Sequence, residues 1–404
     1  MASLITRAGQ FVKQPTGYRA FVPASLPPEP PIDFNASLIT LLSAADQAVG
    51  RLDGVSKTLL NLELFVAMYV RREAVLSSQI EGTQSSLDDV LTYELDPGVR
   101  NLPDDVEEVV NYVRAMNYGL NRLTTFPLSL RLIREIHSEL LTGVRGADKS
   151  PGEFRTSQNW IGGANASLAQ ASFVPPPPHE MRTALDNFES FLYDDRLPAL
   201  IQCGLAHAQF ETIHPFLDGN GRVGRLLITL LLCHRAVLHR PLLYISYYLK
   251  RNRAEYYDRL TAIREQGNWE GWLQFFLRGI ADTAAEATDT AGRIIDLREG
   301  HRILIQENEL GTSALRLLDF LFQRPIINVN AVKDRLEVSF STANKIVGQL
   351  ESLGIITELT GGQRHRAFRY TPYLDLFTDS QPSEDQDVPV QMTESIGSLT
   401  ESDG

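Results

Sequence analysis

The chain carries the sequence HPFLDGNGRVGR from residue 214 to residue 225, and its residue types are unusual for a structural turn. His214 can gain or lose a proton near neutral pH. Asp218 is a hard carboxylate of the kind that binds hydrated Mg²⁺. Gly219 and Gly221 flank Asn220, and positions without side chains let backbone N–H groups approach an anion closely. These residues predict a site rather than a simple turn.

Two arginines follow the glycines at helical spacing. Arg222 and Arg225 are three residues apart, so they share one face of a helix. Residues 226–233 are almost all apolar, which predicts a buried helix that begins just after the glycines. A glycine-rich turn that leads into a helix N-terminus binds anions, and two arginines there can neutralise a polyphosphate. A base, a carboxylate that can bind a metal, an anion site and a pair of arginines together indicate phosphate-transfer chemistry.

Other interpretations of this stretch fit less well. Asp-Gly and Asn-Gly pairs are typical of β-hairpins, but an apolar helical run would not follow a hairpin. A calcium loop that starts at Asp218 needs a Glu at its twelfth position, where Thr229 stands. The chain contains no G-x-x-x-x-G-K-[ST] segment, so it has no P-loop of that type. A purely structural turn is the remaining alternative.

Composition places the chain among globular proteins of two or three domains. It has 404 residues, 43% of them hydrophobic, and a formal net charge of −12. Residues 379–404 contain seven acidic residues and no Lys or Arg, which leaves about −5 for the rest and gives no general argument for nucleic-acid or membrane binding. Cys203 and Cys233 lie in apolar helical patterns, which favours a reducing compartment. We expect a cytoplasmic protein, since neither a signal peptide nor a membrane span is visible.

The stretch 214–225 matches H-P-F-x-D-G-N-G-R-x-x-R at every fixed position and so resembles the Fic family of protein adenylyltransferases. The resemblance covers roughly residues 20 to 285. It implies a mainly α-helical core that transfers AMP from ATP to a Ser, Thr or Tyr hydroxyl of a target protein and releases pyrophosphate. His214 would be the general base, and Asp218 would hold the cofactor Mg²⁺. ATP and the target protein are the implied partners, and self-association into a homo-oligomer such as a homodimer is also expected.

The same resemblance assigns nucleotide contacts. The phosphates would meet the motif residues Gly219, Asn220, Gly221, Arg222, Val223, Gly224 and Arg225. The family places an adenine-contacting tyrosine on a later helix, where Tyr256 and Tyr257 are adjacent. Adjacent helical aromatics are usually one core residue and one surface residue, and we assign the adenine contact to Tyr257.

An upstream segment, residues 77–82 (SSQIEG), predicts regulation. Ser77 and Glu81 are four residues apart and share a helix face, and Gly82 is a natural helix stop. A plain helix end is the common alternative. The segment resembles the inhibitory [S/T]-x-x-x-E-[G/N] motif of Fic proteins with an N-terminal inhibitory helix. Ser77, Glu81 and Gly82 would then form the inhibitory site, with the Glu81 carboxylate against Arg225 where the γ-phosphate must lie.

Apolar periodicity predicts the surrounding elements. Residues 1–34 are expected to form an irregular, partly proline-rich arm. Single histidines within two of the predicted helices, His137 and His207, are expected to be structural. Helices are predicted over residues 35–49, 59–74, 104–119, 129–142, 180–193, 199–212, 248–263 and 269–280.

Residues 151–178 break the helical rhythm and predict a β-hairpin. The segment resembles the Fic flap, whose exposed edge holds an extended target segment by β-augmentation. An ordinary surface hairpin is the alternative. We expect the target protein to dock on this flap.

The C-terminal part predicts a small α/β domain. Residues 285–310 form a polar connecting helix, three short helices follow over 314–322, 329–336 and 339–353, and residues 355–370 alternate like a two-stranded wing. Nine Lys and Arg residues against eight Asp and Glu residues between 301 and 375 form no basic stripe. The pattern is that of a winged helix, and it leaves DNA binding and protein contact equally open.

The predicted organisation is an N-terminal helical region with the inhibitory motif (1–110), a Fic core (111–284), a connecting helix (285–311), a winged-helix-like domain (312–376) and a disordered acidic tail (377–404). Alternative functions are a winged-helix regulator whose Fic core senses a nucleotide, and a Fic enzyme that removes AMP from targets. A toxin is disfavoured because the inhibitory segment lies in the same chain.

Overall fold

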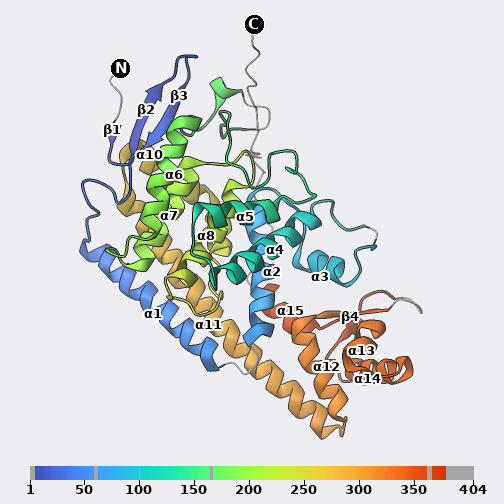
Figure 1. Ribbon diagram of the computed structural model, residues 1–404. Coiled ribbons are helices and arrows are strands. Elements are labelled where there is room, and N and C mark those ends of the chain that lie inside the picture. The colour runs from blue at the N-terminus through green and yellow to red at the C-terminus, as the bar shows by residue number, and fades with distance from the viewer. Residues whose placement is uncertain (1–4, 59–61, 100, 164–166, 362–365, 379–404) are drawn as a thin grey trace.

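The computed structural model describes residues 5–58, 62–99, 101–163, 167–361 and 366–378. Within these ranges the fold is mainly α-helical, as predicted, and each of its two small sheets has three strands (Figure 1). No helix in the described residues is long and apolar enough to cross a membrane.

Two buried helices form the centre of the main domain. α7 (Ala199–Ile213) and α8 (Asn220–His234) pack against each other and are buried along nearly their whole length. The helices around them are α2 (Leu62–Ile80), α4 (Val106–Leu123), α5 (Leu130–Leu140), α6 (Pro178–Leu192), α9 (Ser246–Arg251) and α10 (Arg253–Gln266). The predicted single helix over 248–263 is therefore two, divided at Asn252, whose amide donates to the Tyr248 carbonyl (2.9 Å).

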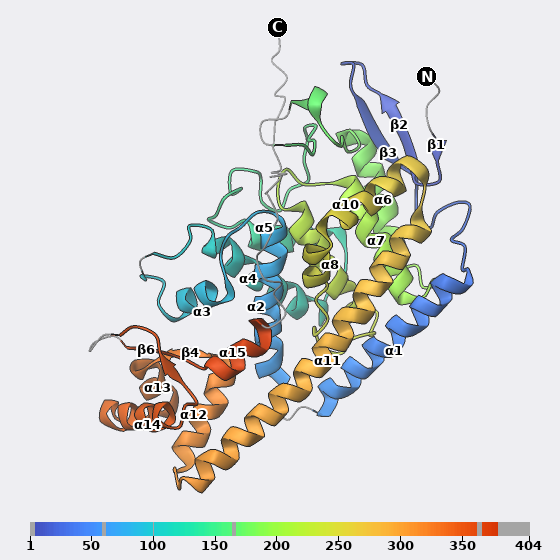
Figure 2. The same ribbon diagram turned by 180° about the vertical axis from the view of Figure 1, so that it is seen from behind.

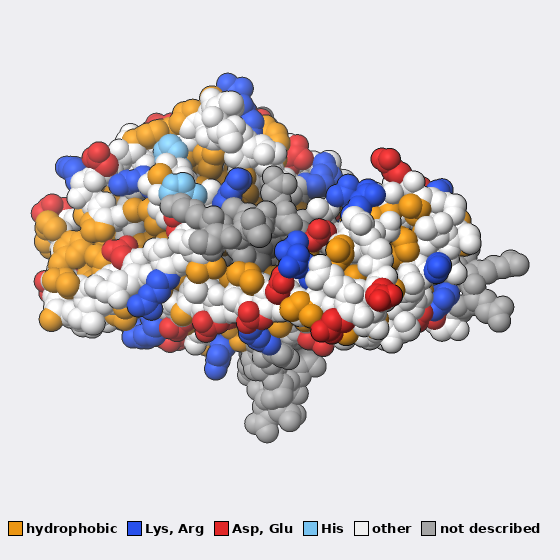
Figure 3. Space-filling model, turned by 90° about the horizontal axis from the view of Figure 1, so that it is seen from below, with side chains coloured by type: hydrophobic (Ala, Val, Ile, Leu, Met, Phe, Trp, Pro, Cys, Tyr) orange, Lys and Arg blue, Asp and Glu red, His pale blue; other side chains and the backbone are white. Residues whose placement is uncertain are grey.

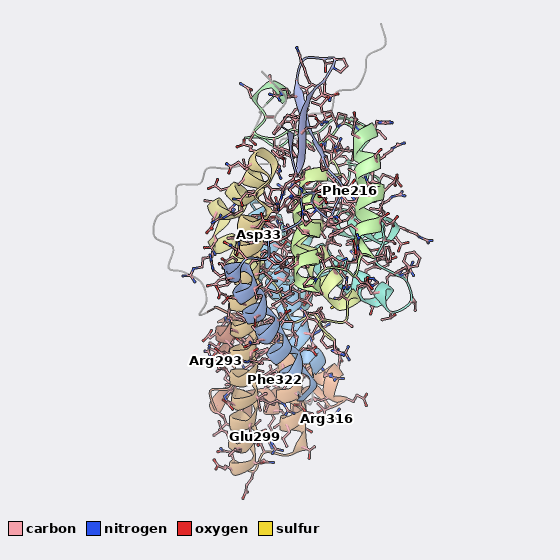
Figure 4. The ribbon with its side chains drawn as sticks, turned by 90° about the vertical axis from the view of Figure 1, so that its left-hand side faces the viewer. Asp33, Phe216, Arg293, Glu299, Arg316 and Phe322 are labelled. Carbon is pink, nitrogen blue, oxygen red and sulfur yellow. The ribbon has the colours of Figure 1, made fainter. Side chains whose placement is uncertain are left out.

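The longest helix, α11 (Trp269–Glu307), joins what the sequence predicted as two separate helices. α1 (Ala36–Thr58) packs along it (Figure 2). Ala284, Ala287 and Ala291 are buried at helical spacing, so the apolar stripe of α11 continues through the predicted break. In Figure 4 Phe216 lies in the upper part of the molecule, whereas Arg293 and Glu299 follow the lower half of α11.

The N-terminal arm is not irregular as predicted. Strands β1 (Ile5–Thr6), β2 (Gly9–Lys13) and β3 (Arg19–Pro23) form an antiparallel sheet in the order β1-β2-β3. Phe11 pairs with Phe21 across β2 and β3, and their rings are 5.0 Å apart in edge contact. Phe21 is fully buried, so this pair anchors the sheet although the surrounding residues are typical of loops.

A smaller C-terminal unit lies beyond α11. Its elements are α12 (Thr312–Gln323), β4 (Ile326–Asn328), α13 (Val329–Leu336), α14 (Phe340–Ser352), β5 (Thr357–Glu358) and β6 (Ala367–Arg369), with the sheet order β4-β6-β5. α13 and α14 are N-capped by Asn328 and Ser339. The tail predicted to be disordered lies outside the described residues, apart from its first two positions.

Besides the N-terminal strands, the sequence analysis did not predict β4, α3 (Leu87–Leu95) and α15 (Thr371–Thr378). The capping box between Ser86 and Asp89 starts α3, a signal that was available in the sequence. α15 returns from the C-terminal unit to the main domain, where Phe377 packs edge-on against Tyr69 of α2 (5.4 Å between ring centroids). The unit therefore contacts the helix that carries the predicted inhibitory residues.

Candidate active site

His214 ends α7 in a left-handed conformation, with φ of 48° and ψ of 61°. Its N–H closes the last turn of the helix on the Phe210 carbonyl (2.9 Å). Burial, followed by the charges of Arg155 and Arg264, lowers the pKa of the imidazole to about 3. His214 is therefore neutral at pH 7 and can accept a proton.

The loop from His214 to α8 is closed by the side chain of Asn220. Its Oδ1 accepts the Phe216 N–H (2.8 Å), and its Nδ2 donates to the Phe216 carbonyl (2.9 Å). Asn220 is fully buried. The side-chain amide of Asn220 thus holds the loop, and its backbone N–H is a helix N-terminal donor.

His137 of α5 supports the same loop from the opposite side. Its ring stacks on Phe216 at 3.7 Å between centroids. Nδ1 accepts the Gly152 N–H (2.8 Å), so Nε2 carries the proton and donates to the Asp218 carbonyl (3.0 Å). Burial lowers the pKa of His137 to about 4, which keeps this arrangement neutral. His137 is structural, as expected, yet it shapes the site.

The first turn of α8 is the place where the sequence predicts an anion site. Gly219 precedes it with φ of 77° and provides no side-chain cap. The first N–H with a backbone acceptor in this turn is that of Val223, which donates to the Gly219 carbonyl (3.0 Å). The N–H groups of Asn220, Gly221 and Arg222 precede it at the positive end of the helix dipole.

Val223 and Gly224, both expected to contact the nucleotide, are packed within the protein in this structure. Val223 is buried in the core and its N–H is already bonded. A Cβ at Gly224 would lie 2.4 Å from Oε1 of Glu211, so this glycine allows α7 and α8 to approach each other. From Val223 onward the i to i−4 bonds of the helix use the backbone N–H groups.

Asp218 and Arg222 belong to one charged cluster. Arg222 Nη2 lies 3.4 Å from Asp218 Oδ1, and Arg222 Nη1 lies 3.3 Å from Glu108 Oε2 on α4. Arg145 pairs with the same glutamate at 3.2 Å. Burial raises the pKa of Glu108, and the charges of Arg222 and Arg145 oppose that rise. Glu108 thus fixes the guanidinium of Arg222 beside the loop.

Asp218 fits a magnesium ion that is also held by phosphates. Its Oδ1 accepts the Gly219 N–H (2.6 Å), and a Cβ at Gly146 would lie 2.7 Å from its Oδ2, so the surrounding backbone is shaped around this carboxylate. The described residues contain no cluster of three or more His, Cys, Asp or Glu side chains that could hold a metal. Mg²⁺ is commonly bound through one or two carboxylates, waters and substrate phosphates, which this single carboxylate matches.

The predicted contact between Glu81 and Arg225 is present. Arg225 Nη2 lies 2.6 Å from Glu81 Oε1, and the two side chains are 1% and 16% exposed. Ser77 holds the same guanidinium: its Oγ accepts from Nε (2.8 Å) and its carbonyl accepts from Nη2 (2.9 Å). Gly82 then turns the chain away with φ of 101°.

The Glu81 carboxylate also lies against the anion site. A Cβ at Gly221 would be 2.2 Å from Glu81 Oε1 and 3.0 Å from Arg225 Nη1. Any side chain at position 221 would therefore collide with the ion pair. The carboxylate occupies the approach to the first turn of α8, the place where an anionic ligand would approach the same backbone.

Tyr256 and Tyr257 divide as expected into a core residue and a partly exposed one. Tyr256 is buried, and its hydroxyl is hydrogen bonded to His207 Nε2 (2.9 Å). His207 Nδ1 bonds the Gly224 carbonyl (2.9 Å), so this histidine is structural, as expected. Burial raises the pKa of Tyr257, the charge of Glu81 raises it further and the charge of Arg225 lowers it. Tyr257 therefore lies near the ion pair.

The predicted flap hairpin is reduced to one antiparallel bridge between Ile161 and Phe173 in the described part of residues 151–178. Arg155 and Gln158 bind backbone carbonyls with their side chains, which holds the start of the segment in an irregular conformation. The Phe21 N–H donates to the Val174 carbonyl (2.9 Å), so the N-terminal sheet borders the flap.

Several residues of the site were missed. Glu108 falls four positions before Tyr112 on the apolar face of its helix, a signal that was present in the sequence. Arg155 and Asn159, which bind the His214 carbonyl, follow no periodic pattern. Only the folded chain brings them to the base.

Together these features describe a helical protein in which a buried neutral histidine, the Asp218 carboxylate, the N-terminus of α8 and the Glu81–Arg225 ion pair lie in one region. Residues 39–121 match the Fic/DOC family N-terminal model, and residues 127–232 match the Fic/DOC family model. Over these residues the chain is therefore similar to the Fic/DOC family.

Curated relatives extend the match. The protein adenylyltransferase Fic of Drosophila willistoni is 30% identical over 220 residues, which are 53% of this chain and 40% of that protein. The protein adenylyltransferase Fic of Aedes aegypti is 32% identical over 192 residues, 46% of this chain and 34% of that protein. The chain thus spans 40% or less of the length of these relatives.

A solved structure supports the fold. A Fic family protein from Desulfovibrio desulfuricans G20 aligns with a TM-score of 0.56 at 18% identity and covers 84% of this chain and 97% of that one.

Proposed function

We propose that this chain transfers AMP from ATP to a Ser, Thr or Tyr hydroxyl of a target protein. The observation that carries the proposal is the neutral His214 at the end of α7, one short loop before the anion site of α8. In the reaction the hydroxyl oxygen bonds to the α-phosphorus of ATP, the bond to the β-phosphate oxygen breaks, and pyrophosphate leaves. The hydroxyl proton passes to the imidazole of His214.

The phosphates would be held by the first turn of α8. The N–H groups of Asn220, Gly221 and Arg222 are donors toward an anion, and the guanidinium groups of Arg222 and Arg225 balance charge on the β- and γ-phosphates. Asp218 would bind Mg²⁺, which neutralises phosphate charge when bound. Tyr257 is the proposed adenine contact, supported by its partly exposed side chain and by the charge of Arg225 acting on it.

We propose that Glu81 inhibits this reaction. Its carboxylate occupies Arg225 at 2.6 Å and lies against Gly221, so a γ-phosphate would meet negative charge and a guanidinium that is already paired. ATP could then bind only with its α-phosphate displaced, and a displacement of about 1 Å can cost roughly 100-fold in rate. Ser77 and Gly82 support the role by holding the arginine and by ending the helix.

Two proposals concern macromolecular partners. A target segment would pair with the flap beside the Ile161–Phe173 bridge, where the chain is already extended. The C-terminal unit is proposed to be a winged-helix domain that contacts protein. Arg366 pairs with Glu351 and Glu358, and Arg369 pairs with Asp375, so both arginines in the described part of the wing are paired with carboxylates. Lys and Arg are interspersed with Asp and Glu on the face seen in Figure 3.

Labelled ATP tests the proposal directly. Incubating the Glu81→Gly variant with α-³²P-ATP, Mg²⁺ and cell lysate should give labelled protein bands, including the variant itself. The matched control is Glu81→Gly combined with His214→Ala. If neither the variant nor any lysate protein becomes labelled although the variant still binds ATP, AMP transfer is refuted and a nucleotide sensor is favoured. Loss of label from an AMP-modified target in the wild type would indicate AMP removal.

The assembly state is a separate proposal. We expect a homodimer, which sedimentation at several protein concentrations tests, and we expect cytoplasmic localisation in the cell of origin.

A further inference from the structure

The backbone of His214 is held in an unfavourable conformation by residues outside its own motif. A residue other than glycine in the left-handed region costs roughly 1–2 kcal/mol, so surrounding contacts must maintain it. The carbonyl oxygen of His214 accepts two side-chain donors, Arg155 Nε at 2.9 Å and Asn159 Nδ2 at 3.2 Å. Both donors lie in the segment that leads into the flap.

Each of these two side chains also donates hydrogen bonds to a second segment of the structure. Arg155 is 2% exposed and donates to the carbonyls of Ser157 (3.2 Å), Pro176 (2.5 Å) and Ile213 (3.4 Å). Its own N–H donates to the Pro215 carbonyl (2.9 Å). The Arg155 guanidinium thus joins the two ends of the flap to the end of α7.

Asn159 continues this connection into the loop. Its Nδ2 donates both to the His214 carbonyl and to the Phe216 carbonyl (2.8 Å). The Asn220 side chain is hydrogen bonded to both backbone groups of Phe216. Asn159 therefore connects the flap to the start of α8 as well as to His214.

We propose that Arg155 and Asn159 are positioning residues for the base, and that they set the His214 imidazole relative to the flap. The inference rests on the proposed role of His214 as the base. A target segment that pairs with the flap would then meet an imidazole that is held by the same scaffold. The phosphates are held by α8, so these two residues should act on the transfer step and not on ATP binding.

The charge of Arg155 and its hydrogen bonds can be separated by experiment. Arg155 and Arg264 both act on His214 by charge, after burial as the larger cause. Arg264 does not contact the His214 carbonyl: its Nε donates to Thr212 Oγ1 (3.3 Å) and its guanidinium lies 3.8 Å over the Phe173 ring. Asn159 has the hydrogen bond without the charge.

The test uses the Glu81→Gly protein as the active parent. Asn159→Ala and Arg155→Lys should each lower kcat by about 10- to 100-fold while KM for ATP stays within about twofold. The control Arg264→Gln should lower kcat by less than about threefold. Unchanged kcat in both flap variants would overturn the proposal, and so would a fall in ATP affinity equal to the fall in kcat.

A second measurement does not depend on transfer activity. In wild-type protein labelled with ¹³C-histidine, the backbone carbon shifts of His214 report its left-handed conformation, and the imidazole shifts report its protonation. Asn159→Ala should change the backbone shifts of His214 and leave the pH titration of its imidazole unchanged. Arg264→Gln should move the imidazole titration toward higher pH and leave the backbone shifts unchanged. If backbone shifts stay native in Asn159→Ala and Arg155→Lys, the positioning role is refuted even where the parent enzyme transfers AMP. If no transfer occurs in the Glu81→Gly parent, the proposed function fails and these shifts still decide the positioning role.

Discussion

Replacing Glu81 by glycine removes the carboxylate that is paired with Arg225. The contact is short, at 2.6 Å, and the arginine is almost fully buried while the glutamate is 16% exposed. A hydrogen bond to a charged group contributes about 1.5–3 kcal/mol, and about 1.4 kcal/mol corresponds to a tenfold change. If a γ-phosphate must displace this contact, Glu81→Gly should raise the rate of AMP transfer by about 10- to 100-fold.

Self-modification with labelled ATP measures this gain. Glu81→Gln keeps an oxygen that can accept from Arg225 but loses the charge, so its rate should lie between those of the wild type and Glu81→Gly. Adding Arg225→Ala to Glu81→Gly should abolish the gain, because the phosphate then loses its cationic partner. An unchanged or lower rate in Glu81→Gly would refute the inhibitory role.

The same substitution should also change stability. Without Glu81, the buried guanidinium of Arg225 keeps only its bonds to Ser77, and an uncompensated buried charge is destabilising. Glu81→Gly should therefore melt at a lower temperature than the wild type in the absence of ligand. ATP with Mg²⁺ should restore more stability to the variant than to the wild type, because the phosphate replaces the lost anion. Equal ligand-induced shifts in both proteins would contradict this reasoning.

Three further outcomes are expected. His214→Ala should lower transfer by roughly 10²- to 10⁴-fold while calorimetry finds ATP affinity nearly unchanged; full activity would exclude the base role. Asp218→Asn should depress activity and raise the Mg²⁺ concentration needed for half-maximal rate, and an unaltered metal titration would reject Asp218 as the ligand. Burial raises the pKa of Glu211 from its ordinary 4.5 to about 7. As the pH rises, the Glu211 carboxyl ionises first in the unfolded chain. The stability that this carboxyl contributes to the folded protein is therefore present below pH 4.5 and is lost as the pH rises to 7. Glu211→Gln should therefore stabilise the protein above pH 7, by up to about 3 kcal/mol, and have little effect near pH 4.5; equal effects at both pH values would count against a buried, neutral Glu211.

The local sequence determined the elements whose signals lie within a few residues. The apolar run after Gly221 predicted α8, and helical spacing predicted α7 and α13 to within a residue or two. The glycines and arginines of residues 214–225 predicted the anion site because a helix N-terminus and its first turn are local geometry. The four-residue spacing of Ser77 and Glu81 placed both on one helix face for the same reason.

Contacts between distant segments were decided only by the tertiary structure. Arg155 and Asn159 reach the His214 carbonyl across more than 50 residues, and Glu108 reaches Arg222 across 114. The side-chain amide of Asn220 can bind a loop or a ligand, and its bonds to the backbone of Phe216 follow from the tertiary structure. Apolar periodicity predicts which face of an element is buried, but it does not predict which residues pack against that face. The sequence by itself therefore determined the helices and the motif, and the packing of α4, α5 and the flap around the motif decided which groups hold the base, the carboxylate and the arginines in place.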